Sequence, residues 1–383
     1  MRQRTFLSIA FLSLSTLLQA QSSAASPRIA ARMKDMIQAK EIPGSVTLVA
    51  TRSGVTHLQA IGSADPAGTK PLRKDSIFWI ASMTKPITGT AILMLQEEGK
   101  LSVDDLVGKY IPELGSLKTP SGKPANLTLK HLMTHTSGLP EATPDESRAA
   151  KKLADLIPAY INKPMQFDPG SKWQYCQSGI NTLGRIIEVV SGQPYEVFLE
   201  KKLFGPLGMK DTTFYLRQEQ LERLVSPVKR AEDGTLTETA IGLLQGKSPT
   251  STDRYPAANG GLFSTAPDYA RFARMILNAG SLDGKRYLKP ESVRQMTTVQ
   301  SGDLKTGFTP GNGWGLTWCL VREPRGVSAM LSPGTHGHGG AYGTQAWIDP
   351  VKGVALILMV QRSNFGNSDA SAVRQAFQSA ALE

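Results

Sequence analysis

The chain has 383 residues, of which 40% are hydrophobic and 20% are charged, and its formal net charge is +11. This length allows a large core in one or two domains, and a globular composition excludes wholesale disorder. The Lys and Arg residues are dispersed, without a basic run interleaved with aromatic side chains, so we expect no nucleic-acid partner. Cys176 and Cys319 show no disulfide framework, and we expect two separate buried thiols.

The first 25 residues have the pattern of an export signal. Arg2 and Arg4 precede an apolar stretch from Phe6 to Leu18, and the small residues at 23–25 provide a cleavage site. The apolar stretch is short for a membrane span, and no later segment reaches transmembrane length. We therefore expect residues 1–25 to be a signal peptide and residues 26–383 to be periplasmic or secreted, with a retained N-terminal anchor as the alternative.

Helical and β-rich segments alternate in chain order. A helix is predicted at 27–40, and a hairpin joins strands at 45–51 and 56–62 through Arg-Ser-Gly. An extended stretch at 77–80 leads into an apolar helix that ends near residue 100. Further helices are predicted at 149–161, 178–190, 194–203 and 266–279, with a short helix and a glycine turn within 126–140.

The C-terminal third is β-rich again. A hairpin signal stands at Glu232-Asp-Gly, strands are predicted at 314–321, 343–348 and 354–361, and a helix at 370–381 closes the chain. Strands at both ends with helices between them indicate a discontinuous α/β domain. We place its two parts at about 27–110 and 256–383, and an inserted helical region at about 111–255.

A Ser-x-x-Lys sequence, Ser82-Met-Thr-Lys85, lies where the extended stretch gives way to the apolar helix. Positions i and i+3 share one face of a helix, so the lysine amine can reach the serine hydroxyl. The helix start also presents unpaired N–H groups and a partial positive charge, which favour an oxyanion and a neutral, basic lysine. These are the parts of a serine nucleophile, although four-residue matches of this kind also arise by chance.

A second candidate is Tyr175, on a loop that enters the helix predicted at 178–190. Near a cationic lysine a phenol loses its proton more easily, and it can then relay a proton from Ser82 to a leaving group. The alternative is a structural pair in which Tyr175 packs against Trp173 at the start of the helix.

The third candidate is the glycine-rich run from Thr335 to Thr344, which contains His338 and Ala341. Glycines around a histidine at the start of a strand allow the backbone to approach a ligand closely. The N–H of Ala341, on an edge strand, would be a second oxyanion donor beside that of Ser82. A plain glycine turn is the alternative.

Two other chemistries are disfavoured. No Gly-x-Ser-x-Gly elbow occurs, which argues against an α/β-hydrolase. His131 and His135 have i,i+4 spacing, and His336 and His338 are close together, but no Glu follows His131 as a zincin helix requires. We therefore expect no metal site.

Together these segments resemble the serine β-lactamase and penicillin-binding protein superfamily, and most closely its class C β-lactamase-like branch, which includes the family VIII carboxylesterases. The resemblance extends from about residue 27 to 365. The matching motifs are Ser82-Met-Thr-Lys85, Leu132 to Pro140, Trp173 to Gly179, Gly192 to Met209, Gly260 to Thr265 and His338-Gly339-Gly340. The resemblance implies an α/β (α+β) fold, in which a mostly antiparallel sheet is flanked by helices and the site lies between the sheet and an α-helical region.

The resemblance also implies roles. Ser82 would be the acylated nucleophile, Lys85 a base or electrostatic partner, and Tyr175 a general base in acylation that helps to activate water in deacylation. The backbone N–H groups of Ser82 and Ala341 would form the oxyanion hole, and no metal or organic cofactor is implied. Whether Lys85 or Tyr175 takes the first proton is open.

Two departures from the family pattern affect the residues that would bind substrate, which are Gln177, His338, Gly339 and Gly340. Gln177 stands where the family's β-lactam processors usually have Asn, and its extra methylene displaces the amide. His338 replaces the lysine of Lys-Thr-Gly, and a histidine with an ordinary pKa is mostly neutral at pH 7, so it attracts a carboxylate less. Both changes favour neutral ester substrates.

The sequence therefore predicts an exported carboxylesterase that acts on small or medium acyl esters through a Ser82 acyl-enzyme. A class C-type β-lactamase or a D-Ala-D-Ala carboxypeptidase is the rival in the same fold, because an export signal and a basic chain suit peptidoglycan. A catalytically silent binding module is a third alternative, disfavoured because Ser82, Lys85 and Tyr175 are all present.

Overall fold

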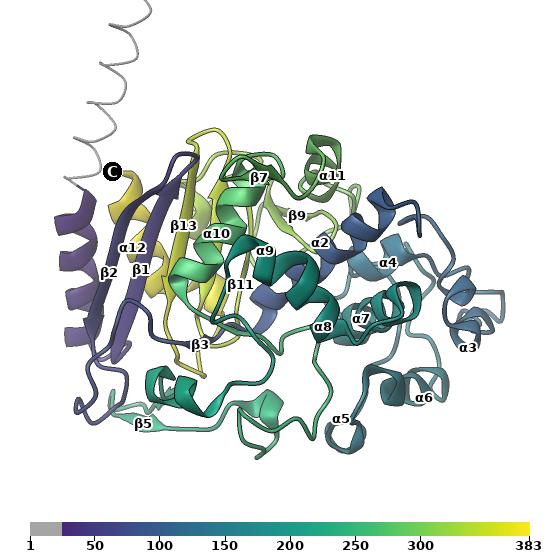
Figure 1. Cartoon of the computed structure of the whole chain (residues 1–383), viewed down its shortest axis with the longest axis horizontal. Coiled ribbons are helices and arrows are strands. Elements are labelled where there is room, and N and C mark those ends of the chain that lie inside the picture. The colour runs from purple at the N-terminus through teal and green to yellow at the C-terminus, as the bar shows by residue number, and fades with distance from the viewer. Residues whose placement is uncertain (1–24) are drawn as a thin grey trace, which may run out of the picture.

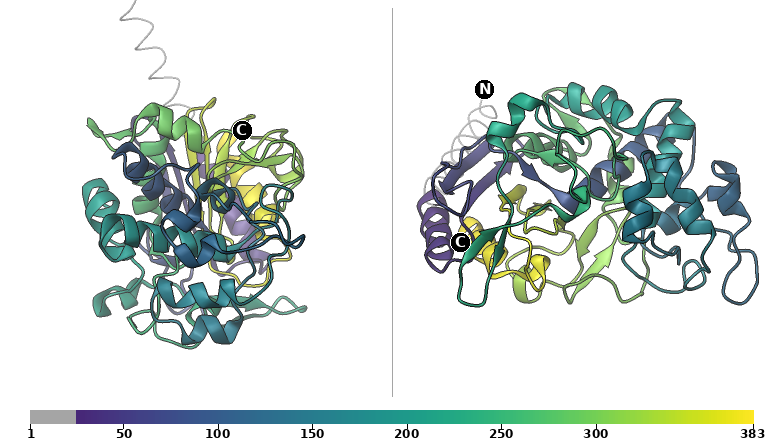
Figure 2. Two further views of the ribbon diagram at one scale, coloured as in Figure 1. Left: turned by 90° about the vertical axis from the view of Figure 1, so that its right-hand side faces the viewer. Right: turned by 90° about the horizontal axis from the view of Figure 1, so that it is seen from below.

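A computed structural model describes residues 25–383 of the chain (Figure 1). The predicted export signal lies outside this range, apart from Ala25. Strands from both ends of the chain form one side of the molecule, and helices from the middle of the chain form the other (Figures 1 and 2). Within residues 25–383, no helix is both long and apolar enough to span a membrane.

The central sheet has seven strands in the order β2-β1-β13-β12-β11-β10-β9, and every pairing in it is antiparallel. Strand β1, from the N-terminal part, lies beside β13, from the C-terminal part, and the antiparallel pairing confirms the mostly antiparallel sheet that the resemblance implies. The strands are β1 (Gly44–Thr51), β2 (Val55–Gly62), β9 (Asn312–Trp314), β10 (Cys319–Val321), β11 (His336–Gly339), β12 (Gln345–Asp349) and β13 (Val354–Met359).

Alternate residues of the central strands pack on opposite faces of the sheet, as the two-residue period of a strand requires. Leu48 and Ile357 join the core that contains α2 (Thr84–Glu97) and α10 (Ala266–Leu277). Their neighbours in sequence pack instead with the helix at residues 25–38 and with α12 (Ala372–Leu382). The sheet is therefore covered by helices on both faces.

The helical region packs against α2, so it continues the core of the sheet. Its longest helix, α7 (Gln177–Ser191), lies directly on α2. Its other helices are α3 (Pro112–Gly115), α4 (Leu129–Met133), α5 (Pro144–Ala149), α6 (Ile157–Ile161), α8 (Tyr195–Leu199) and α9 (Gly205–Leu207). Outside this region, α11 (Pro290–Met296) packs on α2.

Short strand pairs complete the fold. They are β3 (Phe78–Trp79) with β6 (Phe263–Ser264), β4 (Val228–Arg230) with β5 (Leu236–Glu238), and β7 (Ser281–Leu282) with β8 (Lys285–Arg286). The β4–β5 pair is the hairpin predicted at Glu232-Asp-Gly, and its turn contains Gly234 with a φ of 83°.

Two elements that were predicted to be continuous are interrupted in the structure. The helix expected at 149–161 is broken, because Ala150 is extended and Pro158 lies in the first turn of α6, where its missing N–H costs no helical bond. The strand expected at 314–321 is divided into β9 and β10 by a turn, in which Thr317 has a φ of 68°. Both breaks depend on local backbone conformation, which hydrophobic periodicity does not report.

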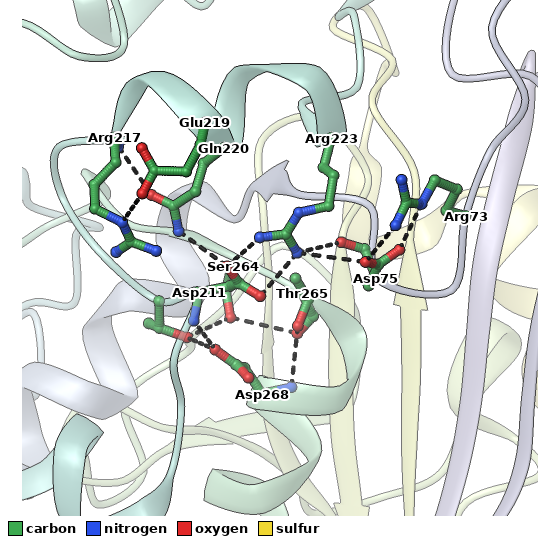
Figure 3. A network of polar contacts seen from close by, with 11 residues as sticks. Arg73, Asp75, Asp211, Arg217, Glu219, Gln220, Arg223, Ser264, Thr265 and Asp268 are labelled. Atoms are coloured by element: carbon green, nitrogen blue, oxygen red, sulfur yellow. Dashed lines mark hydrogen bonds and ion pairs between the residues drawn. The ribbon is translucent and has the colours of Figure 1, made fainter.

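A polar network connects the segment after residue 210 to the loop before β3 (Figure 3). The Arg223 guanidinium donates to the Asp211 carboxylate at 2.8 Å and to the backbone carbonyl of Asp75, just before β3, at 3.0 Å. The backbone N–H of Asp211 donates to Asp268 in the first turn of α10 at 2.7 Å. The network thereby joins the loop before β3, the segment at 211–223 and the start of α10.

Candidate active site

Ser82 lies in a 3-10 turn, Ala81–Met83, between β3 and α2. The preceding residue, Ala81, has a φ of 46°, a left-handed conformation that is strained for a residue with a Cβ. Neighbouring backbone holds this turn in place. The N–H of Ile80 donates to Leu262 O at 3.0 Å, and the Thr84 hydroxyl donates to Ala81 O at 2.7 Å.

Lys85 is fully buried beneath Ser82, and its amine has three oxygen neighbours. Nζ lies 3.0 Å from Ser82 Oγ, 2.9 Å from Gln177 Oε1 and 2.6 Å from the carbonyl of Asn259. Burial lowers the pKa of Lys85 to about 7, although the Glu141 carboxylate acts in the opposite direction. At neutral pH a large fraction of Lys85 is thus an uncharged amine beside the serine hydroxyl.

Tyr175 lies just before α7, and the centre of its ring is 4.6 Å from Lys85 Nζ. Burial raises the pKa of Tyr175 well above its ordinary value, although a hydrogen bond with Ser82 works in the opposite direction. The expectation that a nearby lysine eases the ionisation of this phenol was therefore wrong. Desolvation is the largest cause of the shift, and Lys85 is itself only partly charged.

His338 lies in β11, and its tautomer follows from its contacts. Nδ1 is 2.7 Å from Gly339 O, and a carbonyl can only accept, so Nδ1 carries the proton and Nε2 is an acceptor. Nε2 is 3.3 Å from the Tyr175 hydroxyl, which therefore donates to it. Burial and the nearby Lys85 lower the pKa of His338 to about 3, so the imidazole is neutral.

Two expectations about this segment need correction. The predicted strand start at His338 lies inside β11, and β11 is between β10 and β12 rather than at the edge of the sheet. Ala341 belongs to the turn that follows, where the N–H of Gly343 donates to Gly340 O at 2.9 Å. The candidate oxyanion donor is thus a turn amide and not an edge-strand amide.

Gln177 is the first residue of α7, and its carbonyl oxygen is engaged on two sides. Oε1 accepts from Lys85 Nζ and, at 2.9 Å, from Asn259 Nδ2. The Glu141 carboxylate caps the same helix end and accepts from the N–H groups of Gln177 at 2.5 Å and Ser178 at 2.9 Å. Only the amide nitrogen of Gln177 is left to meet a substrate.

Sequence reasoning missed three residues of this site, which are Glu141, Asn259 and Asp369. Asn259 directly precedes the family-like Gly260–Thr265 segment, and this position was the only signal for it. Glu141 directly follows the family-like Leu132 to Pro140 segment, and Asp369 lies in a 3-10 helix, Ser368–Ala370, that carries no motif. The Asp369 carboxylate comes so close to Gly339 that a Cβ on that glycine would lie 1.9 Å from its Oδ1.

The histidines at 131 and 135 have structural surroundings. His131 caps α4, where its Nδ1 accepts from Thr128 N at 3.2 Å, and His135 lies beyond the end of that helix with a φ of 59°. Within residues 25–383, no group of three or more His, Cys, Asp or Glu residues is placed to hold a metal ion. Cys176 and Cys319 are free and buried, which confirms the two separate thiols.

Three comparisons agree with this fold. The family model described as Beta-lactamase matches residues 29–381. Esterase EstB of Burkholderia gladioli is 27% identical over 92% of this chain and 93% of its own length, and a putative D-alanyl-D-alanine carboxypeptidase of Escherichia coli O157:H7 is 26% identical over 89% and 83%. The solved structure of EstCE1, a hydrolase with promiscuous acyltransferase activity, superposes with a TM-score of 0.80 at 21% identity and covers 94% of this chain and 99% of its own.

The fold and the serine–lysine pair define a serine hydrolase. The chain belongs to the β-lactamase family, with the β-lactamase and penicillin-binding protein type of fold.

Proposed function

We propose that this protein is a carboxylesterase that acts through a Ser82 acyl-enzyme. One observation carries the proposal: the serine hydroxyl lies 3.0 Å from a lysine whose pKa burial lowers to about 7, beside a neutral histidine in the third motif. The site therefore has an activated nucleophile but no fixed positive charge at His338 to attract a carboxylate. The esterase among its relatives supports the same assignment.

In the acylation step, the uncharged amine of Lys85 accepts the Ser82 proton as Oγ attacks the ester carbonyl. The N–H groups of Ser82 and Ala341 stabilise the oxyanion. Tyr175, protonated because of its raised pKa, donates a proton to the departing alkoxide, and the Lys85 ammonium returns the serine proton to the resulting phenolate, so that both groups are restored as the alcohol leaves. In deacylation, water attacks the acyl carbon and Lys85 accepts a proton from it. The bond between the acyl carbon and Oγ then breaks, and Lys85 passes the proton to Oγ, which restores Ser82.

The neighbourhood of Tyr175 favours an apolar group on the substrate. Phe308 is 50% exposed, and its ring centre lies 5.0 Å from that of Tyr175 and 6.0 Å from that of Trp173. An exposed aromatic ring beside the proton donor offers apolar surface to a small or medium ester.

A β-lactamase or D-Ala-D-Ala carboxypeptidase is the second candidate, because the carboxypeptidase among the relatives is matched over most of the chain. The same site chemistry would open a β-lactam or cleave a peptide. The predicted export signal and the net charge of +11 suit a periplasmic or secreted enzyme that meets peptidoglycan.

Intact-mass spectrometry separates the two candidates. The wild type and Ser82→Ala are each mixed briefly with a short-chain p-nitrophenyl ester and, separately, with a cephalosporin. Esterase function predicts an acyl adduct from the ester that turns over quickly, with no adduct or a persistent one from the cephalosporin. Faster turnover of the cephalosporin would assign the protein to the rival class. No adduct from either reagent, with Ser82→Ala indistinguishable from wild type, would contradict both.

A further inference from the structure

The two donors of the proposed oxyanion hole come from segments far apart in the chain. Ser82 follows β3, whereas Ala341 follows β11. An oxyanion is bound well only when both N–H groups lie about 3 Å from it, so the separation of the two segments has to be held accurately. Among residues 25–383, no acceptor is found for the Ala341 N–H, and Ala341 itself is exposed, as a free donor must be.

The Ser82 side of the hole is positioned by Trp79. This residue lies in β3, three positions before the nucleophile, and is paired with Phe263 in β6. Its indole N–H donates to Gly260 O at 2.7 Å in a buried contact. Gly260 in turn packs on Ala81, since a Cβ on that glycine would lie 3.5 Å from Ala81 C. The indole therefore holds Gly260 against the strained turn.

The Ala341 side is positioned by the next residue, Tyr342. Its backbone carbonyl accepts from Arg362 N at 3.0 Å. Its hydroxyl donates to Ala240 O at 2.8 Å and accepts from Gly242 N at 3.2 Å. These contacts anchor the turn both to the end of the sheet and to the segment at 240–242.

The two anchors touch one another. The ring centres of Trp79 and Tyr342 are 4.8 Å apart with an interplanar angle of 89°, an edge-to-face contact. We propose that the Trp79–Tyr342 pair is a positioning contact that helps to set the distance between the N–H of Ser82 and the N–H of Ala341. This inference rests on the proposed acyl transfer at Ser82. It assigns no contact with substrate to either ring.

The first test is Tyr342→Phe, which keeps the ring but removes both hydrogen bonds of the hydroxyl. The matched control is Tyr287→Phe. The Tyr287 hydroxyl also donates to a backbone carbonyl, Pro206 O, at 2.8 Å, and Tyr287 directly follows β8, outside the site. The readouts are kcat and KM for a short ester, the inhibition constant of an aryl boronic acid that forms a tetrahedral adduct on serine, and the Tm.

We expect Tyr342→Phe to lower kcat about five- to tenfold while KM stays within twofold of the wild-type value. The inhibition constant of the boronic acid should rise by the same factor as kcat falls. Tyr342→Leu, which also removes the ring contact, should lower kcat on the order of 100-fold, as the loss of one oxyanion donor does. Tyr287→Phe should change neither kcat nor the inhibition constant of the boronic acid, while it alters the Tm about as much as Tyr342→Phe does. A fall in kcat without weaker boronic acid binding, or an equal fall in Tyr287→Phe, would overturn the inference.

A double-mutant cycle tests the pair itself. Trp79→Phe and Tyr342→Leu should each lower kcat. The double variant should be no slower than the slower single variant, because both substitutions act on the same distance between the two N–H groups. A fall in kcat of the double variant equal to the product of the two single falls would contradict the proposal. If the wild type turns over the cephalosporin instead of the ester, the ratio of each variant's kcat to the wild-type kcat is measured with the cephalosporin. The proposed esterase function then fails while this inference is still tested, and a wild type that turns over neither contradicts both.

Discussion

Burial acts in opposite directions on the two residues that could take the serine proton. It lowers the pKa of Lys85 to about 7 and raises the pKa of Tyr175 well above its usual value. Environments that push two pKa values apart in this way assign the acid and the base. We therefore propose Lys85 as the base and Tyr175 as the proton donor.

The pH dependence of kcat/KM for a neutral ester tests this assignment. Below its pKa, Lys85 is protonated and cannot accept the serine proton, so kcat/KM should fall about tenfold per pH unit below pH 6. Above about pH 8 it should be constant, with a midpoint near 7. An activity that continues to rise towards pH 10 would instead indicate the Tyr175 phenolate as the base.

Glu141 offers a second test at the same scale. Its carboxylate caps α7 and raises the pKa of Lys85, so Glu141→Gln should move the midpoint of the pH profile to lower pH. The expected result is a roughly two- to threefold higher kcat/KM at pH 6, with little change at pH 9. Glu146→Gln is the matched control, because Glu146 caps the neighbouring α5 and is not among the groups that act on Lys85. An unchanged midpoint in Glu141→Gln would argue against Lys85 as the titrating group.

At the scale of elements, the site depends on a close approach between the nucleophile turn and the turn after β11. A Cβ on Gly340 would lie 2.1 Å from Thr344 Oγ1 and 2.7 Å from Ile80 O, so an alanine there would push the two segments apart. We expect Gly340→Ala to lower kcat/KM on the order of 100-fold, measured with a short p-nitrophenyl ester. Gly366→Ala is the control, since its added Cβ would meet nothing within 4 Å. Equal activity in the two variants would show that the approach is not needed.

The network of Figure 3 contains a carboxyl whose ionisation costs stability. Burial raises the pKa of Asp268 to about 6. The folded state thus holds a proton that the unfolded chain releases near pH 4. The contribution to stability is present below about pH 4 and is lost as the pH rises through 6, up to about 3 kcal/mol.

Asp268→Asn should remove this dependence while its amide oxygen still accepts from Asp211 N and Thr212 Oγ1. Urea unfolding should show the variant about 1–2 kcal/mol more stable than wild type at pH 8 and not more stable at pH 4. Asp303→Asn, at an exposed position, controls for the loss of one negative charge. A variant that is less stable at pH 8 would show that the carboxylate is favourable there.

At the scale of the whole molecule, the sequence predicted what depends on periodicity and on short motifs. Hydrophobic periods placed the β1–β2 hairpin and α7, and the Ser82–Lys85 spacing placed the amine beside the hydroxyl. It did not show that Asn259 shares Gln177 with Lys85, because that contact joins residues 82 positions apart. It also misjudged Tyr175, because desolvation depends on neighbours such as His135 and Phe308 that come from other segments.

The core also predicts how the molecule unfolds. Proteins of this size commonly unfold through intermediates, and the helical region would be the natural independent unit. Here, however, one continuous hydrophobic cluster contains Leu48 and Ile357 of the sheet, Ile92 of α2 and Leu183 of α7. Because α2 belongs to both parts, melting the helical region would expose the helix that carries the active site. We therefore expect one calorimetric transition, with an enthalpy of about 250 kcal/mol near 60 °C and a van't Hoff enthalpy that matches it. Loss of ester hydrolysis should follow the same curve, whereas two resolved transitions, or a protease-resistant helical fragment, would show that the two parts are separate folding units.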